Sequence, residues 1–337
     1  MNDPLISILL PVKNGSETIL KSIQSMLDQT VENFELIIIF NGTNDGSDIL
    51  VRNSVKDDRI KFIHLDFANL VIALNAGLNI AQGKFIARMD VDDYSLPTRF
   101  ERQLEYFKMQ EELGVVATQV SFTSSIKRSE GIECYTEWQN NLISHEDIYL
   151  SRFIEAPIIH PTVMIRKEFL TLHGGWKDGN FPEDYELWLR LLSKGIKFKK
   201  VPEKLLVWHD HDLRLTRTDK RYSESAFYKI KSSYLASWLK INLKGRPLYI
   251  LGAGKKSRNR LIHLEKDNIS FEGFIDVDSK KCNQKLNGLP VFHYKEIDNL
   301  NSPFFLSYVG GRGQRDLVTN YLEKKGFMDG MDFLIVS

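Results

Sequence analysis

Three carboxylates, Asp90, Asp92 and Asp93, lie close together in the sequence, directly after the apolar segment Lys84–Met89. Uncompensated negative charge is costly at the end of a buried strand. Hard divalent cations such as Mg²⁺ and Mn²⁺ prefer oxygen ligands, and they commonly bridge one or two carboxylates to substrate phosphates. On a strand end, Asp90 and Asp92 are two residues apart and point to one face. The pattern indicates a metal site, with a solvated acidic turn as the alternative.

A second pair of acids, Glu183 and Asp184, follows Pro182 and opens a segment whose apolar residues have helical spacing. That spacing is carried by Leu187, Trp188, Leu191 and Leu192. Acids in the first turn of a helix interact favourably with the helix dipole, which is the structural interpretation. The functional interpretation is a carboxylate held ionised by the helix N-terminus and acting as a general base.

The elements that would position these acids alternate between strand and helix patterns. Apolar runs predict four strands, at Ile6–Val12, Leu36–Phe40, Ile60–Leu65 and Lys84–Met89, and segments of helical spacing separate them. Largely apolar strands separated by helices indicate the α/β class, with a mostly parallel sheet flanked by helices. Ligands bind beyond the carboxyl ends of such strands, where the acids and the polar loops are expected.

The last 90 or so residues show a second start of the same pattern. Gly252-Ala253-Gly254 follows the short strand Leu248–Leu251, and Asp276 follows the next strand, which is the skeleton of a dinucleotide fingerprint. Ser257 stands where a third glycine is expected. We therefore predict two domains, at 1–240 and 246–337, the second a small Rossmann-like α/β domain. A packing or oligomerisation module without a ligand is the alternative for this domain.

Composition excludes several classes of protein. The 337 residues include 45 Lys and Arg and 44 Asp and Glu, a formal net charge of +1. Nucleic-acid-binding proteins normally show a basic excess, so no nucleic-acid partner is expected. Two cysteines, Cys134 and Cys282, are too few for a disulfide scaffold or a zinc cluster. The chain shows neither a signal-peptide pattern nor an apolar stretch of about 18 residues, so we expect a cytoplasmic protein.

The segment Ser223–Leu243 carries an apolar stripe at helical spacing beside Lys229, Lys231 and Lys240, and Lys244 follows it. One interpretation is an interfacial helix that contacts anionic lipid, which would place the protein peripherally at the inner face of the membrane and would suit a lipid-linked acceptor. The alternative is a stripe that packs against the chain's own domains. The sequence predicts no particular oligomeric state.

Motifs in the first 215 residues resemble those of the family-2 nucleotide-sugar glycosyltransferases of GT-A fold. The matching segments, in chain order, are Ile8–Asn14, Phe34–Ile39, Asn41–Ser47, Leu74–Gly77, Gly83–Asp93, His160–Thr162 and Glu183–Arg190. A single motif of this kind would be weak, whereas several in the family's order are a strong signal.

The resemblance implies a role for each acid. Asp92, with Asp90 or Asp93, would hold Mn²⁺ or Mg²⁺ on the donor diphosphate and so stabilise the leaving group. His211 would approach the metal and phosphates, with His209 as its competitor and a solvated loop histidine as the further alternative. Asp184 would take the proton from the acceptor hydroxyl in a single displacement that inverts the anomeric configuration.

The resemblance also implies contacts to both substrates. Residues expected to contact the donor nucleotide are Pro11, Val12, Asn14, Asn41, Arg88 and Asp90, and those expected on the acceptor side are Glu183 and His160. The sequence departs from the family at the end of the second strand, where Phe40 and Asn41 replace the usual paired acids. An Asn carbonyl still accepts the uracil N3–H, and its NH₂ group donates to a carbonyl. A UDP-sugar is therefore the expected donor, with guanosine and thymidine donors open.

The expected function is that of a metal-dependent inverting glycosyltransferase, which moves a sugar from a nucleoside-diphosphate sugar to a glycan or lipid-linked acceptor in surface polysaccharide synthesis. One alternative is an NAD-dependent sugar oxidoreductase built on the C-terminal glycines, against which the incomplete fingerprint argues. Another is a non-catalytic nucleotide-sugar-binding protein. Intact Asp92 and Asp184 argue against that alternative, and the altered pair at Phe40 and Asn41 keeps it open.

Overall fold

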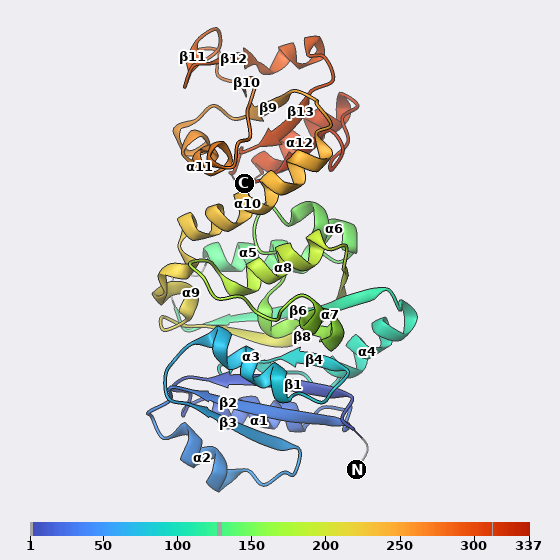
Figure 1. Ribbon diagram of the computed structural model, residues 1–337, viewed down its shortest axis with the longest axis vertical. Helices are drawn as coiled ribbons and strands as arrows, with labels where there is room; N and C mark the ends of the chain where they lie inside the picture. The colour runs from blue at the N-terminus through green and yellow to red at the C-terminus, as the bar shows by residue number, and fades with distance from the viewer. Residues whose placement is uncertain (1–2, 127–129, 312) are drawn as a thin grey trace. The chain divides into compact units, whose positions relative to one another are not determined.

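The computed structural model describes residues 3–126, 130–311 and 313–337 (Figure 1). Contacts within the chain divide it into two units, one of Met1–Ile148 with Ile158–Ser223 and one of Tyr149–Pro157 with Glu224–Ser337. The helix α10 (Glu224–Asn242) thus groups with the second unit, although the sequence placed most of it before the domain limit at 240. The limits 1–240 and 246–337 stay a prediction about how the chain divides into domains.

An eight-stranded sheet is the frame of the first unit, in the order β3-β2-β1-β4-β7-β6-β8-β5. Its strands are β1 (Ile6–Val12), β2 (Phe34–Asn41), β3 (Ile60–Leu65), β4 (Phe85–Arg88), β5 (Tyr94–Ser95), β6 (Leu113–Ser124), β7 (Met164–Arg166) and β8 (Lys197–Asp210). The first four run parallel, and β7 lies antiparallel between β4 and β6. The expected α/β class, with a mostly parallel sheet flanked by helices, is confirmed.

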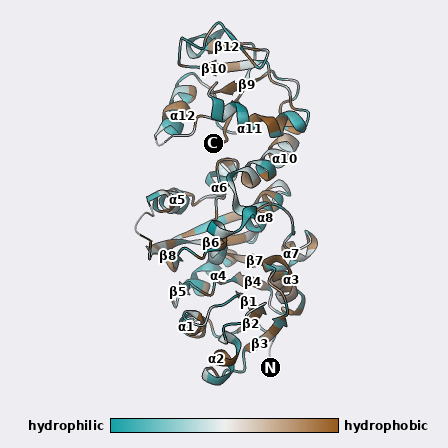
Figure 2. Ribbon diagram, turned by 90° about the vertical axis from the view of Figure 1, so that its left-hand side faces the viewer, coloured by the Kyte–Doolittle hydropathy of each residue, from teal (hydrophilic) through white to brown (hydrophobic). Residues whose placement is uncertain are grey.

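Burial explains why the first strands form where they do. Every residue of β1 and β2 is buried, as expected of parallel strands that are covered on both faces. Figure 2 shows the hydrophobic colouring along these strands. Helix α3 (Leu70–Ile80) packs on them at Gly77, where an added Cβ would lie 2.9 Å from Leu9 Cδ2. This close approach lets the helix cover the strands that end at the polar loops.

The remaining helices of the first unit flank this sheet. They are α1 (Ile19–Leu27), α2 (Ser47–Ser54), α4 (Arg99–Met109), α5 (Glu130–Asn141), α6 (His145–Ser151), α7 (Lys167–Leu172), α8 (Glu183–Ser193) and α9 (Leu215–Thr218), with the short 3₁₀ turns η1 (His160–Thr162) and η2 (Lys220–Tyr222). Helix α8 begins at the predicted residue, Glu183. Its N-terminus carries the second pair of acids into the unit.

The second unit contains a six-stranded sheet in the order β11-β12-β10-β9-β13-β14. Its strands are β9 (Leu248–Leu251), β10 (Gly273–Asp276), β11 (Lys285–Leu286), β12 (Leu289–His293), β13 (Phe304–Ser307) and β14 (Phe333–Ile335), and its helices include α11 (Lys255–Lys266) and α12 (Gln314–Lys324). All pairings are parallel except that of β11 with β12.

Helix α10 buries one face within the second unit. Trp238 packs on Phe304 with ring centroids 5.8 Å apart and donates a hydrogen bond to the Tyr149 hydroxyl. Of the stripe considered for lipid contact, Ile241 is 73% exposed. Within the described part of the chain, no helix is both long and apolar enough to cross a bilayer.

A buried carboxylate joins the amino ends of the central strands. Glu35 on β2 is 3% exposed and accepts hydrogen bonds from Ser7 Oγ (2.5 Å) and the backbone N–H of Gln82 (2.6 Å). Lys61 Nζ on β3 lies 2.7 Å from its other oxygen. Burial by itself would raise the pKa of Glu35, but the bonds from Lys61, Ser7 and Gln82 outweigh it and lower the pKa. The ionised carboxylate therefore stabilises the fold.

Substituting this carboxylate tests that conclusion. We expect Glu35→Gln to lower the free energy of unfolding by about 1–3 kcal/mol at pH 7, because an amide NH₂ then faces groups that also donate. Because folding lowers the pKa of Glu35, the loss of unfolding free energy caused by Glu35→Gln should become smaller as the pH falls below the usual Glu value of about 4.3. Urea unfolding measures both effects. The exposed Glu112→Gln is the control, and equal unfolding midpoints for the two variants would contradict the assignment.

Candidate active site

Three acids gather just beyond the end of β4. One carboxylate oxygen from each of Asp90, Asp92 and Asp93 lies within 4.8 Å of the other two. This is the predicted position, since the acids directly follow the buried strand β4, which ends at Arg88. The structure thus brings together the three residues predicted to hold a metal.

Asp93 is the most deeply buried of the three, at 2% exposed. Its Oδ1 accepts a hydrogen bond from the backbone N–H of His209 (2.8 Å), whereas its buried Oδ2 has no hydrogen-bond partner among the described residues. Burial, reinforced by the charge of Asp92, raises the pKa of Asp93 well above its usual range. A buried carboxylate oxygen without a partner is costly, and a divalent cation would satisfy it, so these residues fit a metal.

Asp92 is held by a histidine from the loop after β8. His211 Nε2 lies 2.7 Å from Asp92 Oδ2. Burial raises the pKa of Asp92, but the bond to His211 and the charges of Arg214 and His211 outweigh it, so the pKa is lowered. Of the two competing histidines, His211 reaches the acids with its ring. His209 contributes its backbone N–H instead, and its Nδ1 lies 3.1 Å from Thr123 Oγ1.

Two arginines flank Asp90. Arg88 is 3% exposed and contacts Asp90 Oδ1 through Nη1, and its Nε is buried without a hydrogen-bond partner in the described chain. Arg214 Nη2 lies 3.8 Å from Asp90 Oδ2, and its guanidinium lies over the Trp208 ring, 4.4 Å from the centroid. Both are suited to phosphate oxygens, which arginine binds through paired N–H groups. No spacing in the sequence singled out Arg214, because its partner Asp90 lies far away along the chain.

Asp184 lies at the start of α8 and is partly exposed. Its Oδ1 accepts a hydrogen bond from the backbone N–H of Tyr185 (2.7 Å). Burial, and then the neighbouring charge of Glu183, raise the pKa of Asp184 to about 7. A carboxyl with a pKa near 7 suits general-base catalysis, because a substantial fraction is ionised at neutral pH and that form is basic enough to accept a proton.

Buried, hydrogen-bonded side chains, among them Glu183 and His160, lie next to the start of α8. Glu183 is 2% exposed and accepts a hydrogen bond from the Tyr222 hydroxyl (2.6 Å). His160 Nε2 accepts one from Trp176 Nε1 (3.0 Å), so its proton sits on Nδ1, which faces Glu183 Oε1 at 3.9 Å. Burial and the charge of Arg88 lower the pKa of His160 well below its usual value and keep the ring neutral. Both predicted acceptor-side residues thus lie beneath the surface.

Side-chain hydrogen bonds connect the loops that follow β1 and β2. Asn14 adopts a positive φ of 53° and accepts a hydrogen bond from the backbone N–H of Asn44 (3.0 Å). Thr43 Oγ1 donates to the carbonyl of Val12 (2.9 Å). Pro11 and Val12, which end β1, are buried directly before this contact. Hydrogen bonds thus join the two loops at the carboxyl ends of these strands, and the expectation that Pro11, Val12 and Asn14 contact the nucleoside stays a prediction.

Asn41 differs from its expected behaviour in one respect. Its carbonyl Oδ1 accepts a hydrogen bond from the backbone N–H of Asn69 (2.8 Å), at the N-cap of α3. The sequence analysis assigned that oxygen to the uracil N3–H. Because the oxygen already holds α3, the NH₂ group of Asn41 is the end better suited to a base, and it would donate to a base carbonyl.

The C-terminal glycines form the predicted turn after β9, with Gly252 at a φ of +95°. Asp276 Oδ2 accepts a hydrogen bond from the backbone N–H of Ala253 (2.8 Å) and lies 3.2 Å from Lys281 Nζ. In a dinucleotide site the corresponding acid binds ribose hydroxyls. Here the acid is engaged by its own glycine loop and a lysine, which argues against that use.

Comparison with known proteins places these features in context. The sequence profile of glycosyl transferase family 2 matches residues 7–172. The chain is 32% identical over 234 residues to the O-antigen biosynthesis glycosyltransferase WbnJ of Escherichia coli, covering 67% of this chain and 88% of that protein. It is 29% identical over 209 residues to the E. coli UDP-Glc:alpha-D-GlcNAc-diphosphoundecaprenol beta-1,3-glucosyltransferase WfaP, covering 58% and 74%.

Two solved structures share the fold. One is S. aureus TarS 1–349 in complex with UDP-GlcNAc, with a TM-score of 0.54 at 13% identity over 77% of this chain and 79% of that chain. The other is the mannosyltransferase PcManGT from Pyrobaculum calidifontis in complex with GDP-Man and Mn²⁺, with a TM-score of 0.50 at 14% identity over 79% and 70%. These similarities confirm the expected GT-A-type fold.

The raised pKa of Asp184 predicts how stability depends on pH. Between the unfolded value of about 3.9 and the folded value of about 7, the folded chain binds a proton that the unfolded chain has lost, so this group destabilises the fold increasingly as the pH rises. We expect Asp184→Asn to remove this destabilisation. Its gain in the free energy of unfolding should be about 1–2 kcal/mol larger at pH 8 than at pH 5, allowing for partial solvent screening. Thermal unfolding at both pH values measures this, and an equal gain at both would contradict the assignment.

Proposed function

The chain belongs to glycosyl transferase family 2, and from that premise we propose that it is a metal-dependent, inverting glycosyltransferase acting in surface polysaccharide synthesis. It transfers a sugar from a nucleoside-diphosphate sugar, with a UDP-sugar as the first choice, to a hydroxyl of a glycan or lipid-linked acceptor. The observation that carries the proposal is electrostatic. Buried Arg88 interacts both with the acids of the candidate metal site, Asp90 and Asp93, and with Glu183 beside the candidate base.

The donor diphosphate would lie at the three acids. Asp92, Asp90 and Asp93 would hold Mn²⁺ or Mg²⁺, and when bound the ion supplies Lewis-acid stabilisation of the leaving diphosphate. Arg88 and Arg214 would donate to phosphate oxygens, and His211 would keep Asp92 oriented. The bound UDP-GlcNAc of TarS and the substrate UDP-Glc in the name of WfaP support a uridine donor, while the GDP-Man of PcManGT keeps guanosine open.

Asp184 would act as the base in a single displacement. Its carboxylate accepts the proton of the acceptor hydroxyl, the acceptor oxygen forms a bond to the anomeric carbon, and the bond from that carbon to the diphosphate oxygen breaks with its electron pair. Attack from the face opposite the leaving group inverts the configuration. Glu183, fixed by Tyr222, raises the pKa of Asp184 through its charge and so strengthens the base.

The names of two relatives support a choice of acceptor and location. WfaP is named for a diphosphoundecaprenol acceptor, and WbnJ for O-antigen biosynthesis, so a lipid-linked glycan presented at the inner face of the membrane is the acceptor we propose. The exposed Ile241 on α10 is a candidate peripheral contact. For the second unit we propose a small Rossmann-like module. The engagement of Asp276 by Ala253 argues against the NAD-dependent alternative.

Metal and donor binding can be tested together. When the UDP concentration, with Mn²⁺ present, is 100 times the dissociation constant, binding should stabilise the folded protein by about 2.7 kcal/mol. The melting temperature should then rise by several degrees. Asp92→Asn should abolish the increase, because it removes a charged ligand. The exposed Asp58→Asn is the control and should retain it. An unchanged shift in Asp92→Asn would remove the metal assignment.

The base is tested by separating binding from transfer. Asp184→Asn should keep the Mn²⁺ and UDP shift but lose transfer by about 10²–10⁴-fold, and the rate of the unaltered protein should rise with pH through about 7. Transfer is measured as UDP release that depends on an acceptor. Asp48→Asn, which also removes an acid from the first turn of a helix, controls for helix stability. Turnover of Asp184→Asn at the unaltered rate would exclude the role, and it would favour a different base.

A further inference from the structure

Helix α1 holds the turn that carries the three acids, and the proposed mechanism makes no use of this contact. We call residues 90–96 the acid turn. The Ser22 hydroxyl, on a residue that is 1% exposed, donates a hydrogen bond to the carbonyl of Asp90 (2.9 Å). Just beyond the end of the helix, Gln29 Nε2 donates to the carbonyl of Leu96 (2.8 Å). The acid turn is thus attached at both ends to α1 and the short segment after it.

The middle of the acid turn lies against Gly15, which precedes α1. A Cβ added at Gly15 would lie 2.5 Å from Cγ2 and 3.2 Å from Cγ1 of Val91, the residue between the first two acids. Carbon atoms in contact are about 3.5–4.0 Å apart, so a methyl group at this position overlaps the Val91 side chain. Gly15 is buried and its φ is not in the left-handed region, so the lack of space, and not the backbone conformation, requires glycine.

Neighbouring hydrogen bonds restrain Gly15 from moving away. Asn14 Oδ1 accepts from the backbone N–H of Asn44 (3.0 Å), and the backbone N–H of Ser16 donates to Asp45 Oδ2 (2.8 Å). The carbonyl of Gly15 itself accepts from two backbone N–H groups at the start of α1 (3.1 and 2.9 Å). Gly15 is therefore fixed on one side by the loop after β2 and on the other by α1, the helix that also holds the acid turn.

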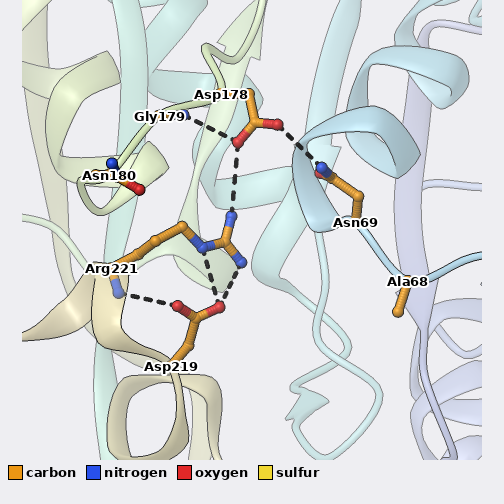
Figure 3. Close-up of a pocket in the computed structure, with 7 residues that line it drawn as sticks. All are labelled: Ala68, Asn69, Asp178, Gly179, Asn180, Asp219 and Arg221. Carbon is orange, nitrogen blue, oxygen red and sulfur yellow. Dashed lines mark hydrogen bonds and ion pairs between the residues drawn. The ribbon is translucent and has the colours of Figure 1, made fainter.

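Another junction between loops of the first unit is polar and open. Figure 3 shows it as a hollow of about 550 Å³, where Asp178 accepts a hydrogen bond from Asn69 Nδ2 (3.0 Å) and lies 3.9 Å from Arg221 Nη1. Polar groups beside an open hollow can shift and let water bridge them. The contact between Gly15 and Val91 has no such freedom, because close-packed apolar atoms transmit a displacement directly.

A divalent cation requires accurate placement of its ligands. Val91 lies between Asp90 and Asp92, so a displacement of its backbone moves the carboxylates on either side. The side chains of a functional site must be held within about 0.5 Å of the productive geometry. An overlap of roughly 1 Å, the difference between 2.5 Å and an ordinary carbon contact, exceeds that tolerance.

We propose that Gly15 and Val91 are positioning residues of the metal site, and that their contact sets the affinity of the acid turn for a divalent cation before any donor binds. The proposal rests on the proposed function, because that function assigns the three acids to a cation. It also means that the loop expected to contact the nucleoside and the turn expected to hold the cation are packed as one unit.

The geometry allows an exchange of size between the two positions. Gly15→Ala adds the overlapping methyl group, and Val91→Ala removes both Cγ atoms. In the double variant the added Cβ would face only the Cβ of residue 91, at 3.4 Å, which is an ordinary contact. The added methyl group then fills part of the space that the valine side chain has left.

The experiment measures the binding of Mn²⁺ alone to the full chain, by electron paramagnetic resonance of the free ion, together with the melting temperature in the absence of metal. We expect Gly15→Ala to weaken Mn²⁺ binding by about tenfold or more, and Val91→Ala by about two- to fivefold. The double variant should bind Mn²⁺ within about twofold of the unaltered protein, because the two changes compensate and their effects do not add.

The same chain supplies matched controls. Gly131→Ala adds a methyl group that meets no other group within 4 Å in the described chain, and Val55, like Val91, is partly buried against the same hydrophobic core. Gly131→Ala and Val55→Ala should leave the Mn²⁺ affinity unchanged. If Gly15→Ala alone does not fold, the comparison of Val91→Ala with the double variant decides. Adding Gly15→Ala to Val91→Ala should raise the Mn²⁺ affinity, and equal affinities would overturn the proposal.

The outcomes separate this proposal from the proposed function. An unchanged Mn²⁺ affinity in Gly15→Ala would overturn the positioning role, and a simultaneous loss of metal-free UDP binding would show that the nucleotide requires the glycine instead. A double variant that binds Mn²⁺ as weakly as the two single losses combined would overturn the role as well. Failure of the proposed function would appear in the unaltered protein, as an absence of Mn²⁺ binding and of acceptor-dependent UDP release.

Discussion

Compensation of buried charge around Arg88 is the constraint on which the rest of the first unit depends. This arginine ends the buried strand β4, contacts Asp90, and interacts electrostatically with Asp93 and Glu183. Isolated carboxylates at such a depth would be neutralised or expelled, because their desolvation costs several kcal/mol each. The positive charge of the Arg88 guanidinium allows acids from two segments that are distant in the sequence to lie in one region. The sheet order places those segments together, since β7 lies beside β4 and leads into the chain that forms α8.

The same constraint explains what the sequence could predict. Strands β1 and β3 begin and end at the predicted residues, although only β1 is buried throughout and β3 carries Lys61 and His64 among its apolar residues. The acids follow from the end of β4. Helix α5 lies in a stretch where the sequence shows no clear period. Its buried residues are polar (Thr136, Gln139 and Asn140), so hydrophobic spacing could not reveal it. The choice between His211 and His209, and the contacts of Arg214, Arg221 and Tyr222, depend on loops whose partners lie tens of residues away.

Asn41 has a structural role at the end of β2, where the family resemblance led us to expect an acid. An acid at the end of β2 would accept hydrogen bonds with both oxygens, whereas an amide has one oxygen and one NH₂ group. The oxygen holds the backbone of Asn69 and with it the start of α3. Asn41 therefore supports the start of α3, and hydrogen bonds among Asn14, Thr43, Asn44 and Val12 join the loops after β1 and β2.

Carboxylates of one chemical type acquire different properties in this region because their surroundings differ. His211 and Arg214 lower the pKa of Asp92, so it is ionised and ready to bind a cation. Burial raises the pKa of Asp93 and leaves one of its oxygens without a partner in the described chain, a cost that a cation would relieve. Burial and Glu183 raise the pKa of Asp184, so it can accept a proton near neutral pH. A divalent ion would favour the ionised form of Asp93, and Asp184, which α8 carries, would stay basic. In the proposed mechanism, the acids after β4 would hold the cation and Asp184 on α8 would take the proton, and Arg88 interacts with both groups of acids.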